Sequence, residues 1–324
     1  MIRNPGEIHD ENKKIRMLIA GYPGIGKSTL ALSAPKPLHI DLDFGIDRVE
    51  PRYRKPYIQP ASYDEIRHDL AYDPTMTELD RAAAMKELDE FETLVFDTGG
   101  KLITLMSQWA INQNPKYGMR DGSLSLKGYG FVGREFVKLM DHCFYVLHKH
   151  IVIVFHAVED KDGDNTRLRI KVEGQTKNNV WEPMDLGGFV TMVGNDRVIG
   201  FDNCESYFAK GTRGVHGVWK IPALTETSPN DFLEKVIFEK YKEASAAEIQ
   251  RLNEEKKAYA EAMEIGRGIL ESCTDVDTIN SAIEGFNNIH HALTSKKELV
   301  ELWKAKVDEL NLRYNKETKL YEVK

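Results

Sequence analysis

Residues 21–28 read GYPGIGKS and match in full the pattern G-x-x-x-x-G-K-[ST]. In this pattern glycines let backbone N–H groups curl around phosphate oxygens, the lysine reaches the β- and γ-phosphates, and the final hydroxyl ligates Mg²⁺. The flanking residues agree, because 15–20 (IRMLIA) predict a strand and 28–33 (STLALS) predict the first turns of a helix. We therefore predict a phosphate-binding loop, the P-loop, with ligand contacts from Gly21, Tyr22, Pro23, Gly24, Ile25, Gly26, Lys27, Ser28 and Thr29.

Composition narrows the class of protein. The 324 residues are 41% apolar and 29% charged, which fits a globular protein of about two domains. No apolar run approaches the ~20 residues that span a bilayer, and the polar N-terminus lacks the apolar core of a secretory signal. Three widely spaced cysteines form no metal or disulfide pattern, so we expect a reduced, cytoplasmic protein that contacts no membrane. A net charge of −7 argues against a globally basic nucleic-acid coat, but leaves room for a local basic loop.

Short apolar segments alternate with helix-forming segments up to about residue 220. Strands are expected at 37–42, 93–96 and 151–155, helices at 75–90, 101–111 and 131–150, and a long polar loop at 112–130. Further strands are expected at 166–172, 189–193, 197–201 and 205–210, at a partly antiparallel edge. All-apolar strands between helices predict an α/β fold, with a mainly parallel central sheet covered by helices on both faces.

The composition changes again near residue 228, where the chain becomes helical and charged. We therefore predict an N-terminal extension (1–13), an α/β core (14–228) and a C-terminal α-helical region (229–324). The C-terminal region is expected to serve oligomerisation or partner docking, with a catalytic role as the alternative.

Two acidic positions follow predicted strands. Asp97 ends the strand LVFD, the usual position of an aspartate that organises Mg²⁺ together with Ser28; the alternative is that it caps the next helix. Asp41 and Asp43 end the second strand and share one of its faces. Asp43 is the candidate for polarising the attacking water, with Asp41 supporting the local geometry; the alternative is a solvated turn.

His156 follows the strand IVIVF directly. A polar residue at the end of a central strand next to the P-loop strand is placed to sense a γ-phosphate and to pass its presence to the following segment, 158–179. The alternatives are a buried, hydrogen-bonded histidine and, for the basic residues of 158–179, an exposed hairpin.

Together these residues resemble the RecA-like P-loop ATPases, and among them the compact phage-encoded proteins of single-strand DNA annealing and recombination. The resemblance covers roughly residues 14–220, and it implies a RecA-like fold that uses ATP and Mg²⁺. It implies that Asp43 stands where the family usually has a catalytic glutamate, one methylene longer, and that His156 stands where glutamine is common. A charged histidine would make the switch sensitive to pH.

The resemblance also implies roles between subunits and toward DNA. Lys210 and Arg213, spaced Lys-x-x-Arg, are expected to reach the γ-phosphate of a neighbouring subunit, with a basic hairpin tip as the alternative. Segments 114–129 and 158–179 interleave cations with aromatics and are expected to contact single-stranded DNA, or else a protein partner. Their candidate DNA-binding residues are Lys116, Arg120, Lys127, Arg167, Arg169, Lys171 and Lys177.

The sequence therefore predicts a Mg²⁺-dependent ATPase that assembles as a ring or filament on single-stranded DNA and promotes annealing or recombination. The predicted catalytic residues are Lys27, Asp43, Asp97, His156, Lys210 and Arg213, and the predicted metal ligands are Ser28 and Asp97. One alternative is an ATP-gated loader or assembly switch that turns over slowly and recruits a replication or recombination protein through its C-terminal helices. A small-molecule P-loop kinase is the third reading.

Overall fold

The computed structural model describes residues 13–162, 165–172 and 176–324, so the predicted N-terminal extension lies almost wholly outside the described residues. The chain divides into two compact units, of which one ends at Ala244 and the other contains Ser245–Lys324. This boundary lies inside helix α7 (Glu239–Ser272), later in the chain than the change of composition near residue 228.

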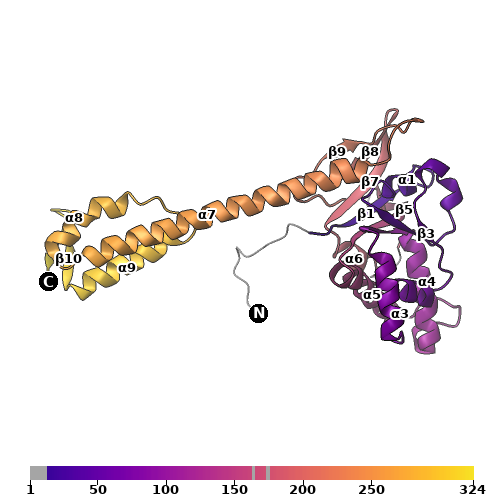
Figure 1. The fold of residues 1–324 in the computed structure, drawn as a ribbon, viewed down its shortest axis with the longest axis horizontal. Coiled ribbons are helices and arrows are strands. Elements are labelled where there is room, and N and C mark those ends of the chain that lie inside the picture. Colours follow the sequence, from indigo (N-terminus) through magenta and orange to yellow (C-terminus); the bar gives the residue numbers. More distant parts are fainter. Residues whose placement is uncertain (1–12, 163–164, 173–175) are drawn as a thin grey trace. The chain divides into compact units, whose positions relative to one another are not determined.

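The first unit is built on one large sheet (Figure 1). Six strands run parallel in the order β3, β2, β4, β5, β1, β7, and the antiparallel strands β8 and β9 extend the β7 edge. Strand β6 pairs antiparallel with β5 beyond the main sheet. The strands are β1 (Arg16–Gly21), β2 (Pro37–Asp41), β3 (Tyr57–Ile58), β4 (Thr93–Asp97), β5 (His150–Asp162), β6 (Asn165–Ile170), β7 (Leu186–Val193), β8 (Asp196–Gly200) and β9 (Val218–Lys220).

Both faces of the central strands are buried. In β1, Leu18 and Ala20 enter one hydrophobic core while Met17 and Ile19 enter the other. The same division occurs in β4 and β5, because successive side chains of a strand point to opposite faces. Strands buried on both sides read as continuous apolar runs, which is the pattern that predicted them. The predicted fold class, a mainly parallel sheet flanked by helices, is confirmed.

Helices cover the two faces unequally (Figure 1). One core joins the sheet to α2 (Tyr63–Asp69), α3 (Glu78–Leu88), α4 (Gly99–Gln113), α5 (Leu126–Asp141) and α6 (Thr176–Trp181). The other joins it to α1 (Lys27–Ala31), the turn η2 (Pro51–Tyr53), the π-helical turn η5 (Leu233–Phe238) and the start of α7. Short turns η1 (Ile46–Arg48), η3 (Pro115–Tyr117) and η4 (His142–Val146) complete the unit.

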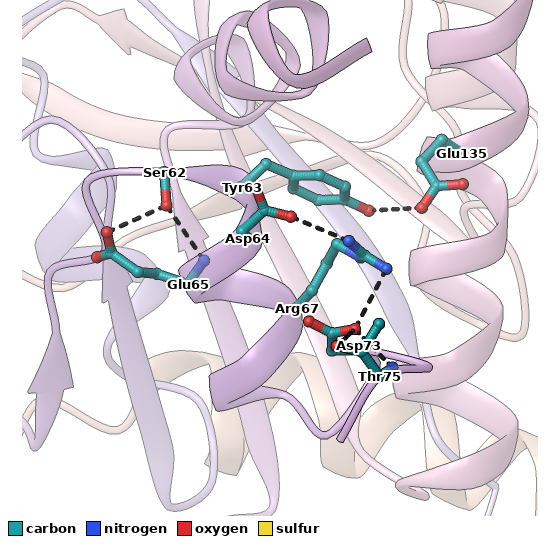
Figure 2. A network of polar contacts seen from close by, with 8 residues as sticks. All are labelled: Ser62, Tyr63, Asp64, Glu65, Arg67, Asp73, Thr75 and Glu135. Carbon is teal, nitrogen blue, oxygen red and sulfur yellow. Dashed lines mark hydrogen bonds and ion pairs between the residues drawn. The ribbon is translucent and has the colours of Figure 1, made fainter. Parts of the chain in front are cut away.

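A polar network anchors α2 beside α5 (Figure 2). The Tyr63 hydroxyl donates to the buried carboxylate of Glu135 at 3.0 Å, and burial raises the pKa of this phenol. Arg67 holds Asp64 at 3.0 Å and Asp73 at 3.6 Å, so the end of α2 is tied to the segment that follows it. The network therefore fixes the helix that follows β2 and β3 against the main body of the unit.

Two segments differ from the sequence-based expectation, and a third takes the form given as its alternative. The polar loop expected at 112–130 is shorter, because the Ser125 hydroxyl accepts from the Gly128 N–H and starts α5 at Leu126. The expected strand 205–210 forms two isolated bridges instead, Leu168 with Tyr207 and Gly187 with Lys210, because the segment crosses from β6 to β7. In 158–179 the chain forms the β5–β6 hairpin that was named as the alternative, and β6 lies where a strand was expected at 166–172.

The second unit is helical, as predicted, and also contains a small hairpin. Helices α8 (Val276–Asn287) and α9 (Ser295–Glu309) pack with α7 around a core that includes Phe286, Leu299 and Trp303. Strands β10 (Leu312–Asn315) and β11 (Leu320–Val323) pair antiparallel, and the sequence analysis did not anticipate them. Within the described residues of the chain, no helix combines the length and the apolar character needed to cross a membrane.

Candidate functional site

The P-loop joins the end of β1 to α1, and its backbone requires glycine. Gly24 and Gly26 have φ of 79° and 87°, a left-handed conformation that side chains with a Cβ disfavour. At Gly21 a Cβ would lie 2.7 Å from the Val190 carbonyl oxygen of the neighbouring strand β7. Glycine is therefore favoured at three points of the loop, two of which, Gly21 and Gly26, are the glycines of the motif.

Lys27 begins α1 and is buried. Its Nζ donates to the Tyr22 carbonyl at 2.8 Å, inside the loop that it is predicted to serve. Burial lowers the pKa of Lys27, whereas the carboxylates of Asp97 and Asp43 act to raise it. The ammonium therefore lies in the field of two acidic groups from two other strands.

Asp97 ends β4 with a nearly buried side chain. Its Oδ2 lies 3.4 Å from Nε2 of His39 on β2, and neither ring nitrogen of His39 has a hydrogen-bond partner among the described residues. The cap of α4 is Thr98, whose hydroxyl accepts from the Lys101 N–H at 3.3 Å. The alternative of Asp97 as the helix cap is therefore wrong, because Thr98 has that role.

Asp41 and Asp43 have different surroundings. The Asp41 carboxylate is fully buried and accepts from the Gly45 N–H at 2.8 Å, the Ile46 N–H at 2.9 Å and the Gln59 amide at 2.8 Å. Asp43 is part-exposed, with its Oδ2 3.2 Å from Arg48. Burial and then the Asp97 carboxylate raise the pKa of Asp43, against the effect of Arg48. Asp41 thus shapes the turn that presents Asp43.

His156 pairs in register with Gly21, so the expected neighbouring of its strand and the P-loop strand β1 is confirmed. The expected strand end is wrong, because β5 continues past His156 to Asp162. Its Nδ1 is buried without a hydrogen-bond partner among the described residues. Burial and then the Lys27 ammonium lower the pKa of His156, while Asp43 and Asp97 raise it. The ring is therefore favoured in its neutral form.

These residues meet at one edge of the sheet. The registers that align Asp41 with Asp97, and Gly21 with His156, place the carboxyl ends of β1, β2 and β4 on the same side of the sheet as His156 of β5. Asp43 and Asp97 both act on the pKa values of Lys27 and His156, which agrees with a position of these side chains on that side. The arrangement offers a cation, two carboxylates and an imidazole around a loop shaped for phosphate.

Donor chemistry at this edge fits Mg²⁺. Mg²⁺ prefers oxygen donors and keeps several waters, so it needs only one or two protein ligands beside phosphate oxygens. The hydroxyl of Ser28 and the carboxylate of Asp97 are donors of that kind. In the described part of the chain there is no cluster of three or more His, Cys, Asp or Glu side chains that could hold a metal alone.

The two segments predicted to contact DNA meet beside this edge. A pocket of about 570 Å³ is lined by His156 and Lys171 together with Leu124 and Tyr129 of the first segment. A second pocket, of about 470 Å³, is lined by Arg169, Lys177 and aromatic side chains that include Trp181 and Phe208. Arg167 donates to the Glu205 carbonyl and lies over Phe208, while Lys116, Arg120 and Lys127 are exposed near η3 and the start of α5.

Lys210 and Arg213 do not join the site of their own chain. Lys210 pairs with Gly187 at the start of β7, and its Nζ donates to the Met184 carbonyl. The start of β7 belongs to the amino ends of the parallel strands, whereas the P-loop follows the carboxyl end of β1. The guanidinium of Arg213 lies over the ring of Tyr241 at 5.9 Å.

Sequence reasoning missed Arg197. From β8 its Nη1 donates to the Ile25 carbonyl at 3.4 Å, so a guanidinium lies on the P-loop itself. In the segment 196–200 (DRVIG), the pattern indicates only that Arg197 is a polar residue near one end of an edge strand. Only the pairing of β8 with β7, and of β7 with β1, brings it to the loop.

Comparisons with known proteins give one family. A family model described as "AAA domain" matches residues 13–213, the strands and helices that carry the P-loop edge. A solved structure titled "Crystal structure of the RadB recombinase" is similar over 57% of this chain and 79% of that chain, with 13% identity and a TM-score of 0.32. A likeness at that level says nothing about substrates or partners. No curated protein matches the chain closely enough to count as a relative.

Proposed function

Because the chain belongs to the AAA-domain family, which covers residues 13–213, we propose that it is a Mg²⁺-dependent ATPase of the P-loop class. One observation carries the proposal. A glycine-shaped loop and the side chains of Lys27, Asp43, Asp97 and His156 converge at one sheet edge, although they come from four separate strands and their following loops.

Each group has a defined task in this proposal. The P-loop amides and Lys27 bind the phosphates, and Lys27 exchanges its bond to the Tyr22 carbonyl for phosphate oxygen. Ser28 and Asp97 would hold Mg²⁺, which neutralises phosphate charge when bound. Asp43 positions and polarises the attacking water, and its raised pKa makes its carboxylate a better proton acceptor. Asp41 holds the turn in which Asp43 lies.

Nucleotide binding is coupled to single-stranded DNA through two contacts in this proposal. The unpartnered Nδ1 of His156 senses the γ-phosphate beside the pocket that Lys171 also lines. The Tyr22 hydroxyl of the P-loop donates to Glu159 of the β5–β6 hairpin at 2.6 Å. A ligand that moves the loop therefore also moves the hairpin that carries Arg167 and Arg169. Annealing or recombination on single strands is the function that this coupling would serve.

Assembly would complete the site. Lys210 and Arg213 lie at the opposite sheet edge from their own P-loop, which is consistent with action on a neighbouring subunit. They would have to leave the Met184 carbonyl and the Tyr241 ring to do so. An oligomeric ring or filament is therefore part of the proposal, with the C-terminal helices as the docking region for a replication or recombination protein.

One observation favours the second candidate, an ATP-gated assembly switch with little turnover. Arg48 lies 3.2 Å from the Asp43 carboxylate and acts to lower its pKa, so water must compete with the guanidinium for that carboxylate. In this reading ATP controls assembly on DNA and the ion pair persists.

Turnover of ATP by Asp43→Asn, Lys27→Ala and the control Asp47→Asn decides between the two. Asp47 lies in the same turn with its side chain 90% exposed. For the ATPase we expect Asp43→Asn to bind ATP but to hydrolyse it about 10²–10⁴-fold more slowly, Lys27→Ala to lose binding, and Asp47→Asn to match the wild type. ATP-dependent assembly by a wild type without turnover would establish the switch, and equal turnover by Asp43→Asn would remove its catalytic role.

DNA contact is tested by the salt dependence of binding. We expect a labelled single-stranded oligonucleotide to bind more tightly with ATP, and Lys177→Ala to lower the slope of log K against log salt by about 0.7. Lys138→Ala, an exposed lysine of α5, is the matched control. A slope unchanged by Lys177→Ala would exclude a phosphate contact at that residue.

A further inference from the structure

Arg197 packs directly on the backbone of the P-loop. Its Nη1 lies 3.4 Å from the Ile25 carbonyl oxygen, and a Cβ built on Gly26 would lie 2.1 Å from the same nitrogen. The φ of 87° favours glycine at position 26, and its missing Cβ leaves room for the tip of this arginine. The guanidinium is therefore as close to the loop as its backbone allows.

The charge of Arg197 is poorly compensated. Burial lowers its pKa, although a guanidinium remains charged at neutral pH. Among the described residues no carboxylate lies within ion-pair distance, and the Ile25 carbonyl is its one recorded hydrogen-bond partner. A part-buried charge is costly unless an opposite charge accompanies it. An anion held by the P-loop would supply that opposite charge.

Arg197 also lines a pocket of about 260 Å³ beside α1. The wall is mostly apolar, with Leu30, Ile221, Leu224 and Phe232, and it carries polar groups such as Asn230 at its rim. The Asn230 amide donates to the Thr29 carbonyl at 2.7 Å, so the segment that forms the wall is tied to the residue after the P-loop. Apolar walls with a few polar groups are the usual surroundings of a flat heteroaromatic ring.

We propose that Arg197 and this pocket form the base-side half of the nucleotide site. Arg197 leaves the Ile25 carbonyl to bind the polyphosphate chain, and the pocket receives the nucleobase. This inference rests on the proposed binding of a nucleoside triphosphate at the P-loop. Arg197 adds a cation from the same chain, so a single subunit binds nucleotide before any neighbour supplies Lys210 and Arg213.

Two probes test the phosphate contact and the base pocket separately: ATP, and inorganic tripolyphosphate, which has no base. Binding is measured by calorimetry with dilute protein. We expect Arg197→Ala to weaken both probes about 10- to 100-fold, the usual effect of losing a charge-assisted hydrogen bond. Arg197→Lys, which keeps the charge, should recover part of the loss. Lys220→Ala is the control, because this exposed lysine on adjacent β9 pairs only with Asp196, at 2.7 Å, among the described residues.

The pocket is tested by filling it. Leu224→Trp should weaken the binding of ATP at least tenfold and leave the binding of tripolyphosphate unchanged. Pro222→Trp, at an exposed position of the same wall, fills the pocket from a second residue and should have the same effect. Thermal unfolding of each variant shows that it is folded. Unchanged ATP binding in both folded variants would overturn the base pocket.

The outcomes distinguish this inference from the proposed function. If the wild type binds neither probe, or Lys27→Ala binds both as well as the wild type, the nucleotide site itself is refuted. If Lys27→Ala abolishes binding while Arg197→Ala leaves both probes unaffected, the P-loop stands and the role of Arg197 is refuted. A loss confined to ATP in Arg197→Ala would contradict the phosphate contact.

Discussion

Replacing Asp41 by asparagine tests how the site is held together. The buried carboxylate accepts three hydrogen bonds, one at Oδ1 from Gly45 and two at Oδ2 from Ile46 and Gln59. Asparagine has one acceptor oxygen, so at least one donor loses its partner and meets an NH₂ group instead. Loss of one charge-assisted bond, with a buried donor left unsatisfied, should lower the free energy of unfolding by about 2–3 kcal/mol.

For a unit of this size that loss corresponds to a fall in melting temperature of roughly 4–12 °C. Circular dichroism during heating measures it, and urea unfolding gives the free energy directly. Asp47→Asn is the matched control and should change stability by less than about 0.5 kcal/mol, since its side chain is 90% exposed. A melting temperature of Asp41→Asn within a degree of the wild type would refute the assigned role of these bonds.

Two further predictions concern stability. Burial lowers the pKa of His150 to about 3, and its Nδ1 accepts a hydrogen bond from the Ile15 N–H at 2.9 Å. Below pH ~6.5 the unfolded state therefore binds a proton at His150 that the folded state does not bind. The free energy of unfolding should fall by up to about 1.4 kcal/mol per pH unit from there down toward pH 3. His150→Gln should flatten this slope in urea titrations, and an unchanged slope would exclude His150 as its source. A Cβ on Gly99 would lie 2.3 Å from the Phe155 ring, whereas a Cβ on Gly100 would have its nearest neighbour at 3.9 Å. Gly99→Ala should therefore lower the free energy of unfolding by about 1–3 kcal/mol, and Gly100→Ala should not. Equal melting temperatures of the two variants would contradict the packing at Gly99.

The sequence predicted those parts of the site whose signals are local. The P-loop is a contiguous motif whose glycines have the conformations that the motif requires. Asp97 and His156 each follow an all-apolar run, and neighbouring parallel strands in a doubly covered sheet bring the ends of such runs to one side of the sheet. Knowing the strand ends was therefore sufficient to expect Lys27, Asp97 and His156 together.

Features that depend on pairing between distant segments were not predictable from the sequence alone. Arg197 reaches the P-loop through two successive strand pairings, and no periodicity at 196–200 encodes them. The segment 205–210 alternates like a strand, but it divides its pairing between β6 and β7. The strand expected at 151–155 continues as β5 to Asp162, beyond its apolar run, because it pairs there with β6. Strand propensity describes such segments, whereas tertiary contacts decide their partners.

The proposed function depends on steady-state ATP hydrolysis measured with and without single-stranded DNA, with Lys27→Ala as the blank. We expect turnover that DNA stimulates and that Lys27→Ala abolishes under both conditions. Turnover that DNA leaves unchanged would contradict the coupling of the P-loop edge to DNA, and hydrolysis that survives in Lys27→Ala would contradict the site itself.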